Sequence, residues 1–270
     1  MIRRLGRETL ALGFVGGVTG DMIRARLDSE GVPHDFDDVP EMTRLNVMLY
    51  ETSIGQRTRI YLPGAHVEPA QIDDLWRRLA AVPAGSVVVL GGSVPPGLPR
   101  DVYRGLVLRL REQGVRTVVD TSGKALEAVL EAGPTLIKPN VEETAEILGR
   151  ALAADEDIFR AAEELRRRGA ENVVVSQGAD GAIGVGPAGA WKAVPPRVVA
   201  RSTVGSGDSM VAGMSIALAE GKGLDEALRL GTAAGAATAM TQGTQLCRPD
   251  DVNRLLPRVV VERLNGRGSR

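Results

Sequence analysis

Ser202-Thr203-Val204-Gly205-Ser206-Gly207-Asp208-Ser209 is a polar turn with two glycines, and an apolar, alanine-rich helical pattern follows it. Glycines let the backbone turn with its N–H groups outward, and a helix start adds unpaired N–H donors and a positive dipole end. This combination binds anions. Asp208 fits two interpretations there: a base that takes a proton from a hydroxyl during phosphoryl transfer, or an acidic residue placed favourably near the helix dipole.

The composition excludes several classes of protein. The chain has 270 residues, enough for one large domain, with 43% hydrophobic and 25% charged residues. A net charge of −1 gives no reason to expect nucleic acid or an anionic membrane as partner. The single cysteine, Cys247, excludes an intrachain disulfide and favours a cytoplasmic location. Two histidines and one cysteine cannot supply a zinc site of the usual kind.

Apolar β-type runs alternate with helical patterns over most of the chain. Short strands buried on both faces and separated by helices predict an α/β fold with a mainly parallel sheet between two helical layers. The predicted strands are Leu10–Gly16, Ser86–Leu90, Val115–Asp120, Thr135–Lys138 and Asn172–Ser176, and the predicted helices lie at about 18–29, 69–80, 100–113, 123–131, 140–149 and 156–168.

Two regions depart from this alternation. Alternating β-rich runs at Thr43–Glu51 and Thr58–Leu62 predict an antiparallel hairpin, and a second hairpin is predicted across residues 181–194. The last third is predicted as three helices, at about 207–220, 224–240 and 250–263. We therefore expect an α/β core at 1–42 and 64–264, a β-hairpin lid at 43–63 and a frayed polar tail at 265–270.

Polar groups follow several of the predicted strands, and ligands of open parallel sheets bind beyond those strand ends. These segments are Leu90–Gly97, Lys138-Pro139-Asn140 with Glu143, and Ser176–Gly181. Asn140 followed by Glu143 also indicates a capped helix start. Each segment alone fits an ordinary tight turn. Together with the glycine turn they are harder to explain as ordinary turns, and Ser176–Gly181 could wrap a nucleotide.

The predicted lid carries cationic side chains. Arg44 and Asn46 share one face of an alternating strand, and so do Arg57 and Arg59. Guanidinium groups on a lid could hold a substrate phosphate, although charged residues also decorate solvated strand edges.

These residues together resemble the PfkB (ribokinase-like) sugar kinases, in the branch of phosphofructokinases and tagatose-6-phosphate kinases. The matching motifs are Ser202–Met210, Gly92–Gly97, Lys138–Asn140 with Glu143, and Ser176–Gly181. Thr43–Val47, Thr58-Arg59 and Thr241–Cys247 are most similar to the minor type of bacterial 6-phosphofructokinase. The resemblance implies a ribokinase-like three-layer α/β/α sandwich with a small β-flap.

The resemblance implies an ATP-dependent kinase of a phosphorylated ketohexose, with fructose 6-phosphate first, and tagatose 6-phosphate or fructose 1-phosphate as alternatives. Asp208 would be the base, and the N–H groups of Gly205, Ser206 and Gly207 would form the anion hole. Mg²⁺ would be organised by Asn140 and Glu143, mostly through water. ATP would be bound by Lys138, Asn140, Ser176, Gln177, Gly178, Ala179, Asp180, Gly181, Thr203, Thr232 and Ala236, and the sugar phosphate by Arg44, Arg59, Gly92, Ser93 and Asp208.

The same resemblance implies a K⁺ ion beside the anion hole and a homodimer formed through the lid. The implied K⁺ ligands, mostly backbone oxygens, are Ser202, Val204, Thr238, Thr241, Gly243 and Gln245. Gln245 and Thr241 stand where a relative has arginine and asparagine, and backbone ligands could survive both changes. Alternating apolar residues in the lid, such as Leu45, Val47 and Leu49, fit a dimer interface or a covered edge.

The family pattern begins with a strand that carries a sugar-binding aspartate, followed by a flap strand and a glycine-rich sugar motif. By this comparison the chain starts within the next helix, with Ile2–Gly6 as its last turn. We expect either that Met1 is a misassigned start or that the chain is a natural short form. An inactive remnant that binds nucleotide is therefore the alternative of another class.

Overall fold

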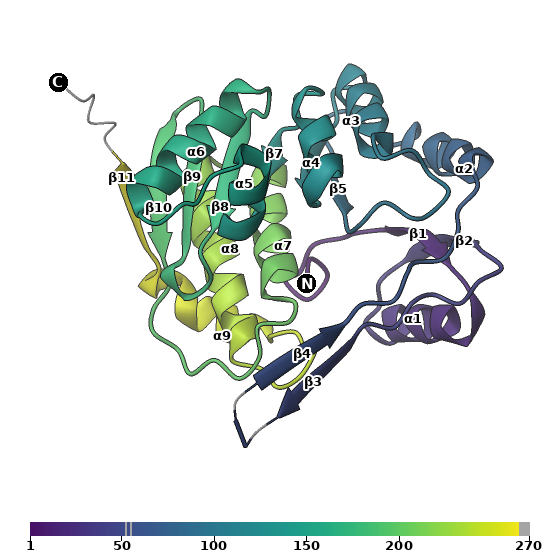
Figure 1. The fold of residues 1–270 in the computed structure, drawn as a ribbon, viewed down its shortest axis with the longest axis horizontal. Helices are drawn as coiled ribbons and strands as arrows, with labels where there is room; N and C mark the ends of the chain where they lie inside the picture. The colour runs from purple at the N-terminus through teal and green to yellow at the C-terminus, as the bar shows by residue number, and fades with distance from the viewer. Residues whose placement is uncertain (52, 55, 265–270) are drawn as a thin grey trace. The chain divides into compact units, whose positions relative to one another are not determined.

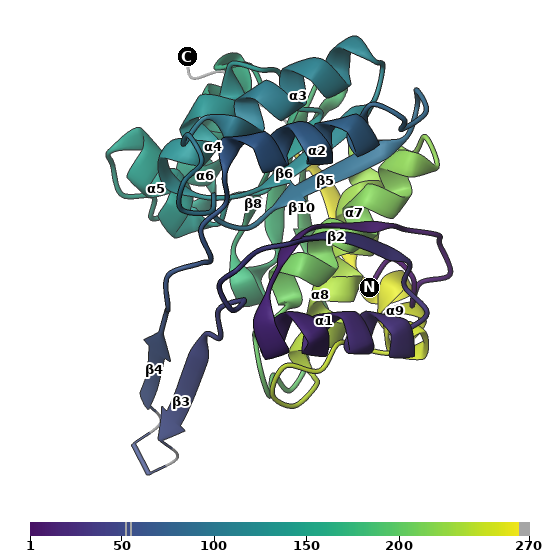
Figure 2. The same ribbon diagram turned by 90° about the vertical axis from the view of Figure 1, so that its right-hand side faces the viewer.

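A computed structural model describes residues 1–51, 53, 54 and 56–264. The chain divides into two compact units (Figures 1 and 2). Unit 1 comprises Met1–Arg7, Val82–Ser93 and the chain from Arg100, and unit 2 comprises Glu8–Ala81 and Val94–Pro99. The predicted polar tail at 265–270 lies outside the described residues.

Unit 1 is built on a seven-stranded sheet in the order β11-β10-β9-β8-β7-β6-β5. Strands β5 to β8 run parallel, and the pairs β8–β9, β9–β10 and β10–β11 are antiparallel. The strands are β5 (Val87–Gly91), β6 (Arg116–Asp120), β7 (Leu136–Ile137), β8 (Asn172–Ser176), β9 (Ala182–Gly186), β10 (Gly189–Val194) and β11 (Val260–Leu264). The predicted mainly parallel sheet and the second hairpin are therefore confirmed, but the strand predicted at Leu10–Gly16 belongs to a separate two-stranded sheet.

Helices cover both faces of this sheet, as Figures 1 and 2 show. Helices α7 (Ser206–Ala219) and α8 (Leu224–Ala239) lie on one face. The other face carries α3 (Val102–Glu112), α4 (Gly123–Leu130), α5 (Val141–Leu148) and α6 (Asp155–Arg167). Helix α6 is amphipathic: Ile158, Phe159 and Leu165 are buried, while its arginines and acids are exposed or half-buried. The three-layer sandwich expected from the sequence is confirmed.

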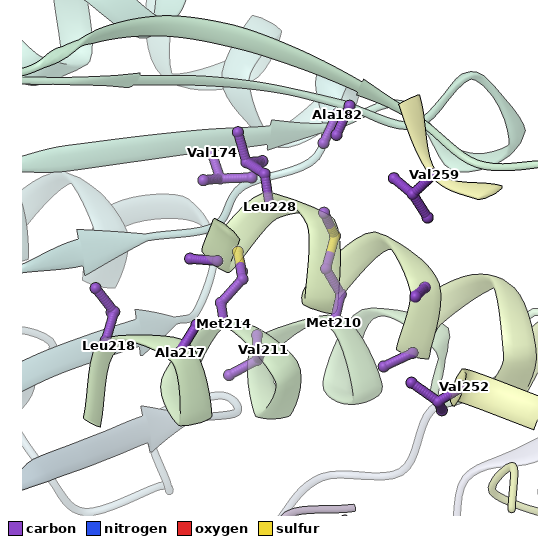
Figure 3. Packing of buried hydrophobic residues seen from close by; sticks show 14 of the residues in the cluster. Val174, Ala182, Met210, Val211, Met214, Ala217, Leu218, Leu228, Val252 and Val259 are labelled. Carbon is purple, nitrogen blue, oxygen red and sulfur yellow. The ribbon is translucent and has the colours of Figure 1, made fainter. Parts of the chain in front are cut away.

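The core between the sheet and the α7–α8 layer holds the start of α7 in place. Every residue from Ser209 to Leu218 is buried, as expected for a helix covered all round. Figure 3 shows Met210 and Met214 of α7 beside Leu228 of α8, with Val174 of the sheet close by. Because interiors are close-packed, this burial fixes α7 relative to the strand ends.

The helix predicted at 250–263 is wrong beyond Leu255. Helix α9 (Pro249–Leu255) gives way to a 3₁₀ turn at Leu256–Arg258, and β11 then pairs antiparallel with β10. Pro257 cannot supply a helical N–H, and the β-branched run that follows, Val259–Val261, favours a strand. The edge of β10 supplies the partner, and this long-range pairing is absent from any local pattern.

Unit 2 contains a small parallel pair and the predicted lid hairpin. Strand β1 (Ala11–Val15) pairs with β2 (His34–Asp38), and α1 (Gly17–Ser29) connects them. The hairpin consists of β3 (Val47–Glu51) and β4 (Gln56–Ile60), with Val47 opposite Ile60. Helix α2 (Pro69–Leu79) follows; the Glu68 N–H donates to Oε1 of Gln71 at its start.

Strand β2 was not predicted from the sequence. Its residues, His-Asp-Phe-Asp-Asp, carry acids in place of the apolar run typical of a buried strand. Arg78 of α2 forms ion pairs with Asp35 and Asp37, so a helix distant in sequence compensates the acids. Among the described residues, no helix is both long enough and apolar enough to cross a bilayer.

Candidate functional site

The carboxyl ends of β5 to β8 bring the predicted polar segments to one edge of the sheet. Gly91 pairs with Asp120, and Asn140 forms an isolated parallel bridge with Ser176. The Thr121 hydroxyl donates to the Gly92 carbonyl at 2.9 Å. Three segments that are separate in sequence therefore lie at the ends of β5, β7 and β8, which run parallel in one sheet: Gly92–Ser93, Lys138–Asn140 and Ser176–Gly181. Gly92–Ser93 ends the Val82–Ser93 part of unit 1, and Val94–Pro99 belongs to unit 2.

The turn that carries Asp208 is shaped by Gly205. This residue has φ +76° and ψ 0° and is the N-cap of α7, a left-handed conformation that favours glycine. The Ser206 N–H donates to the Thr203 carbonyl at 3.3 Å, so one N–H of the expected anion hole already has a partner. Gly207 and Asp208 lie exposed in the first turn, where backbone N–H groups have no partner one turn earlier. The turn therefore presents N–H donors and an exposed carboxylate together.

Lys138 brings a positive charge to this turn. Its side chain is 7% exposed, and its Nζ lies 3.2 Å from Oδ1 of Asp120. The ammonium group also lies close to Gly207, because a Cβ built on that glycine would be 3.6 Å from the same Nζ. The resemblance implies that Lys138 lies near the ATP phosphates, and the structure brings it to the start of α7.

Asp120 is a candidate site residue that the sequence did not single out. It ends β6, its side chain is 22% exposed, and burial raises its pKa. The negative charge of Asp208 raises the Asp120 pKa further, and the Lys138 ammonium opposes both effects. The signal was present, since Asp120 ends a predicted strand just as Lys138 does.

Asn140 and Glu143 form the predicted capping box of α5. The Glu143 N–H donates to Oδ1 of Asn140 at 2.8 Å, and the Asn140 N–H donates to Oε2 of Glu143 at 2.9 Å. The part of the chain that the structure describes has no cluster of three or more His, Cys, Asp or Glu side chains able to hold a metal. One carboxylate still suits Mg²⁺, which keeps several waters and takes its other ligands from substrate phosphates.

The predicted nucleotide loop after β8 is a tight turn. Residues Gly178–Asp180 form a 3₁₀ turn, and the Gln177 N–H donates to the Gly181 carbonyl at 2.8 Å. The side-chain amide of Gln177 donates to Asp155 of α6 at 2.8 Å. Ser176 is the last residue of β8 and Ala179 lies within the 3₁₀ turn, so the predicted segment spans the strand end and the turn that follows it.

The residues expected at the adenine lie on α8. Thr232 is 4% exposed, and its buried hydroxyl has no hydrogen-bond partner within the described residues. Ala236, one turn later, is half-buried, and Thr203 is exposed before the turn of α7. A buried hydroxyl without a partner is uncommon in native proteins, and a bound group or a water could satisfy it.

The segments implied as a K⁺ site converge where α8 ends. The N–H groups of Arg201 and Ser202 both donate to the Ala239 carbonyl. Thr241 Oγ1 lies 2.8 Å from the Thr238 carbonyl and also contacts the Gln245 carbonyl. The Thr241 hydroxyl has one proton and can donate it to only one of these two carbonyl oxygens at a time. The other carbonyl oxygen therefore remains able to bind a cation. The side chain of Val204 has no oxygen that could bind a cation, and its N–H donates to Ser202 Oγ at 3.3 Å. Gly243 lies in the loop that contains Thr241 and Gln245, with φ +59°.

The structure corrects the expected alternation in the lid. Arg44 and Asn46 precede β3, which begins at Val47, so strand periodicity does not place them on one face. A Cβ on Gly64 would lie 3.5 Å from both Arg44 Nη1 and Pro96 Cδ, which puts Arg44 at the base of the hairpin. Arg59 lies in β4 opposite Met48, and its side chain and that of Arg57 lie outside the described residues.

Comparison with known proteins gives consistent similarities. A family model described as pfkB family carbohydrate kinase matches residues 1–251. The chain is 37% identical over 256 residues to ATP-dependent 6-phosphofructokinase isozyme 2 of Escherichia coli (strain K12), covering 94% of this chain and 83% of that protein. It is 34% identical over 263 residues to 1-phosphofructokinase of Borreliella burgdorferi, covering 97% and 84%. The structure of phosphofructokinase-2 from Escherichia coli in complex with potassium matches with a TM-score of 0.89 at 37% identity, covering 95% of this chain and 84% of that one.

Proposed function

Because the chain belongs to the pfkB family of carbohydrate kinases, we propose that it transfers the γ-phosphoryl group of ATP to a hydroxyl of a phosphorylated ketohexose. The observation that carries this proposal is the exposed carboxylate of Asp208 in the first turn of α7, with the Lys138 ammonium close to Gly207. A proton acceptor, N–H donors and a cation at one point are the groups that in-line phosphoryl transfer requires.

In the proposed reaction, Asp208 accepts the proton of the attacking sugar hydroxyl. The N–H groups of the α7 turn and the Lys138 ammonium stabilise charge on the transferred phosphoryl oxygens, because they are fixed before the reaction begins. Glu143 and Asn140 would hold Mg²⁺, mostly through water, and the ion would neutralise charge on the ATP phosphates. The loop Ser176–Gly181 and Thr232 would bind the rest of the nucleotide.

We propose fructose 6-phosphate as the preferred acceptor, with fructose 1-phosphate and tagatose 6-phosphate as the competing substrates. Relatives of comparable similarity are a 6-phosphofructokinase and a 1-phosphofructokinase, which supports the class of substrate and leaves the choice within it to experiment. Arg44 and Arg59 would bind the phosphate already on the sugar, since guanidinium groups recognise phosphate with two parallel hydrogen bonds. Gly92 and Ser93 would contact the sugar.

A coupled assay that follows ADP release tests the function and its alternative. We expect turnover with at least one of the three sugar phosphates and less with ribose or a nucleoside, which lack the phosphate group. A chain that binds ATP but phosphorylates none of these acceptors would be an inactive nucleotide-binding protein, which is the alternative function. Parallel assays with K⁺ replaced by Na⁺ test the proposed monovalent-cation site.

Replacing Asp208 with asparagine tests the proposed base. The change preserves shape but removes the proton acceptor, so we expect kcat to fall by about 10²–10⁴-fold. Binding of ATP, measured by isothermal titration calorimetry, should change little because the nucleotide loop is untouched. The control is Asp225→Asn, an acid in the first turn of the neighbouring helix α8. Equal turnover of the Asp208 variant and the unaltered protein would contradict the assignment.

A further inference from the structure

Lys138 and Asp120 form an ion pair beside the first turn of α7, and Asp120 has no role in the proposed reaction. The backbone fixes where Asp120 stands: it pairs with Gly91, and its carbonyl accepts the Gly92 N–H at 3.0 Å. Lys138 directly follows β7, whose Ile137 pairs with Val119. Neighbouring parallel strands therefore deliver the acid and the lysine side by side.

A lysine needs such a partner if its ammonium group is to be held in one position. Its ammonium group ends a flexible four-carbon stem, and a charge with 7% of its side chain exposed requires a hydrogen-bonded counter-charge. Asp120 supplies one at 3.2 Å, and a Cβ built on Gly207 would lie 3.6 Å from the same Nζ. The pair therefore holds Nζ beside the turn before any phosphate arrives.

We propose that Asp120 is a positioning residue that holds the Lys138 ammonium group against the first turn of α7 for phosphoryl transfer. This inference rests on the proposed function. Direct contact between Asp120 and a phosphate oxygen is disfavoured by like charge, and Asp208 already adds a second carboxylate nearby. Asp120 therefore acts through Lys138.

The Asp120→Asn variant separates positioning from binding. The asparagine has nearly the same shape but no charge, so Lys138 loses the partner that fixes it and moves away from the reacting phosphoryl group. We expect kcat to fall about tenfold to hundredfold, since small misplacements have effects of this size. The KM for ATP should not rise, because one negative charge has been removed from an anion site. Titration of the non-hydrolysable analogue AMP-PNP should likewise show affinity no weaker than in the unaltered protein.

A double-mutant cycle with Lys138→Met shows whether Asp120 works through the lysine. Lys138→Met alone should lower kcat by about 10²–10³-fold, and adding Asp120→Asn should then lower it no further. Asp120→Glu keeps the charge and should recover part of the rate lost in Asp120→Asn. The matched control is Glu220→Gln, which removes a carboxylate paired with Lys222 just beyond the opposite end of α7; its kcat should be unchanged.

Several results would overturn the inference. One is an equal fall in kcat from Asp120→Asn in the unaltered protein and in the Lys138→Met variant, and another is no recovery of kcat in Asp120→Glu. Weaker AMP-PNP binding by Asp120→Asn would also overturn it. So would a higher Mg²⁺ concentration for half-maximal rate, which would make Asp120 a metal ligand. Thermal unfolding of each variant shows whether it is folded. If Asp120→Asn is unfolded, the test uses Asp120→Glu instead. An unaltered protein inactive on every sugar phosphate contradicts the proposed function and this role with it. If the unaltered protein is active but the losses of kcat in the two single variants add up in the double variant, only the proposed role of Asp120 is contradicted.

Discussion

At the scale of single residues, the site depends on backbone conformation as much as on charged groups. Gly205 adopts φ +76°, and a Cβ there would meet Leu246 Cδ2 at 3.3 Å. The left-handed conformation at the N-cap starts α7 at Ser206 and places Asp208 in its first turn, where the N–H groups have no partner one turn earlier. An aspartate alone would not indicate catalysis; the turn around it does.

Gly205→Ala is the residue-scale prediction. An L-residue in the left-handed region costs about 1–2 kcal/mol, so we expect reduced stability and, because the turn must shift, a fall in kcat of about tenfold or more. Gly221→Ala is the control: it has φ +71° with nothing within 4 Å of the added Cβ and lies beyond the far end of α7. The two variants should lose similar unfolding free energy in urea titrations. Equal kcat values in both would contradict a functional role for the Gly205 turn.

At the scale of elements, the first residues of the chain hold the loop that follows α8. Arg4 Nη1 donates to the carbonyls of Leu246 at 2.7 Å and Cys247 at 3.2 Å. A guanidinium thus satisfies two backbone acceptors in the segment that also contains Gln245. The N-terminal turn is therefore part of the structure around the proposed cation site, although it is distant from it in sequence.

Arg4→Ala is the prediction at this scale. Hydrogen bonds that involve a charged group contribute about 1.5–3 kcal/mol, so we expect the unfolding free energy to fall by an amount of that order. The K⁺ concentration for half-maximal activity should also rise, because the loop carbonyls become less ordered. Arg3→Ala is the control, since Arg3 is exposed in the same turn. Stability equal to that of the Arg3 variant would show that the Arg4 contacts contribute nothing measurable.

At the scale of the whole molecule, the lid hairpin presents exposed apolar side chains. All five residues of β3 are exposed; the exposed fraction is 55% for Leu49 and 40% for Met48. Isolated two-stranded hairpins are marginally stable in water, and exposed apolar patches mark interaction sites. We therefore propose that two copies associate through their hairpins, as the sequence resemblance implies.

Sedimentation of a Leu49→Glu variant tests this association. We expect the unaltered chain to sediment as a dimer at micromolar concentration and the variant as a monomer, because a buried unpaired charge opposes association. Met22→Glu is the control, since Met22 is 66% exposed on α1. Monomers in the unaltered protein, or dimers in the Leu49 variant, would exclude this interface.

The sequence by itself determined most of the sheet and the chemistry of the α7 turn. Strand β8 has the predicted bounds, and the Asn140–Glu143 capping box forms as its spacing predicted. These features are local: apolar runs, glycine turns and cap spacing act over a few residues. The tertiary structure decided what depends on distant partners. Strand β11 exists because β10 offers an edge, and β2 because β1 pairs with it and Arg78 compensates its acids. Asp120 enters the site because two parallel strands place it beside Lys138, and pairing between residues far apart in sequence leaves no local pattern.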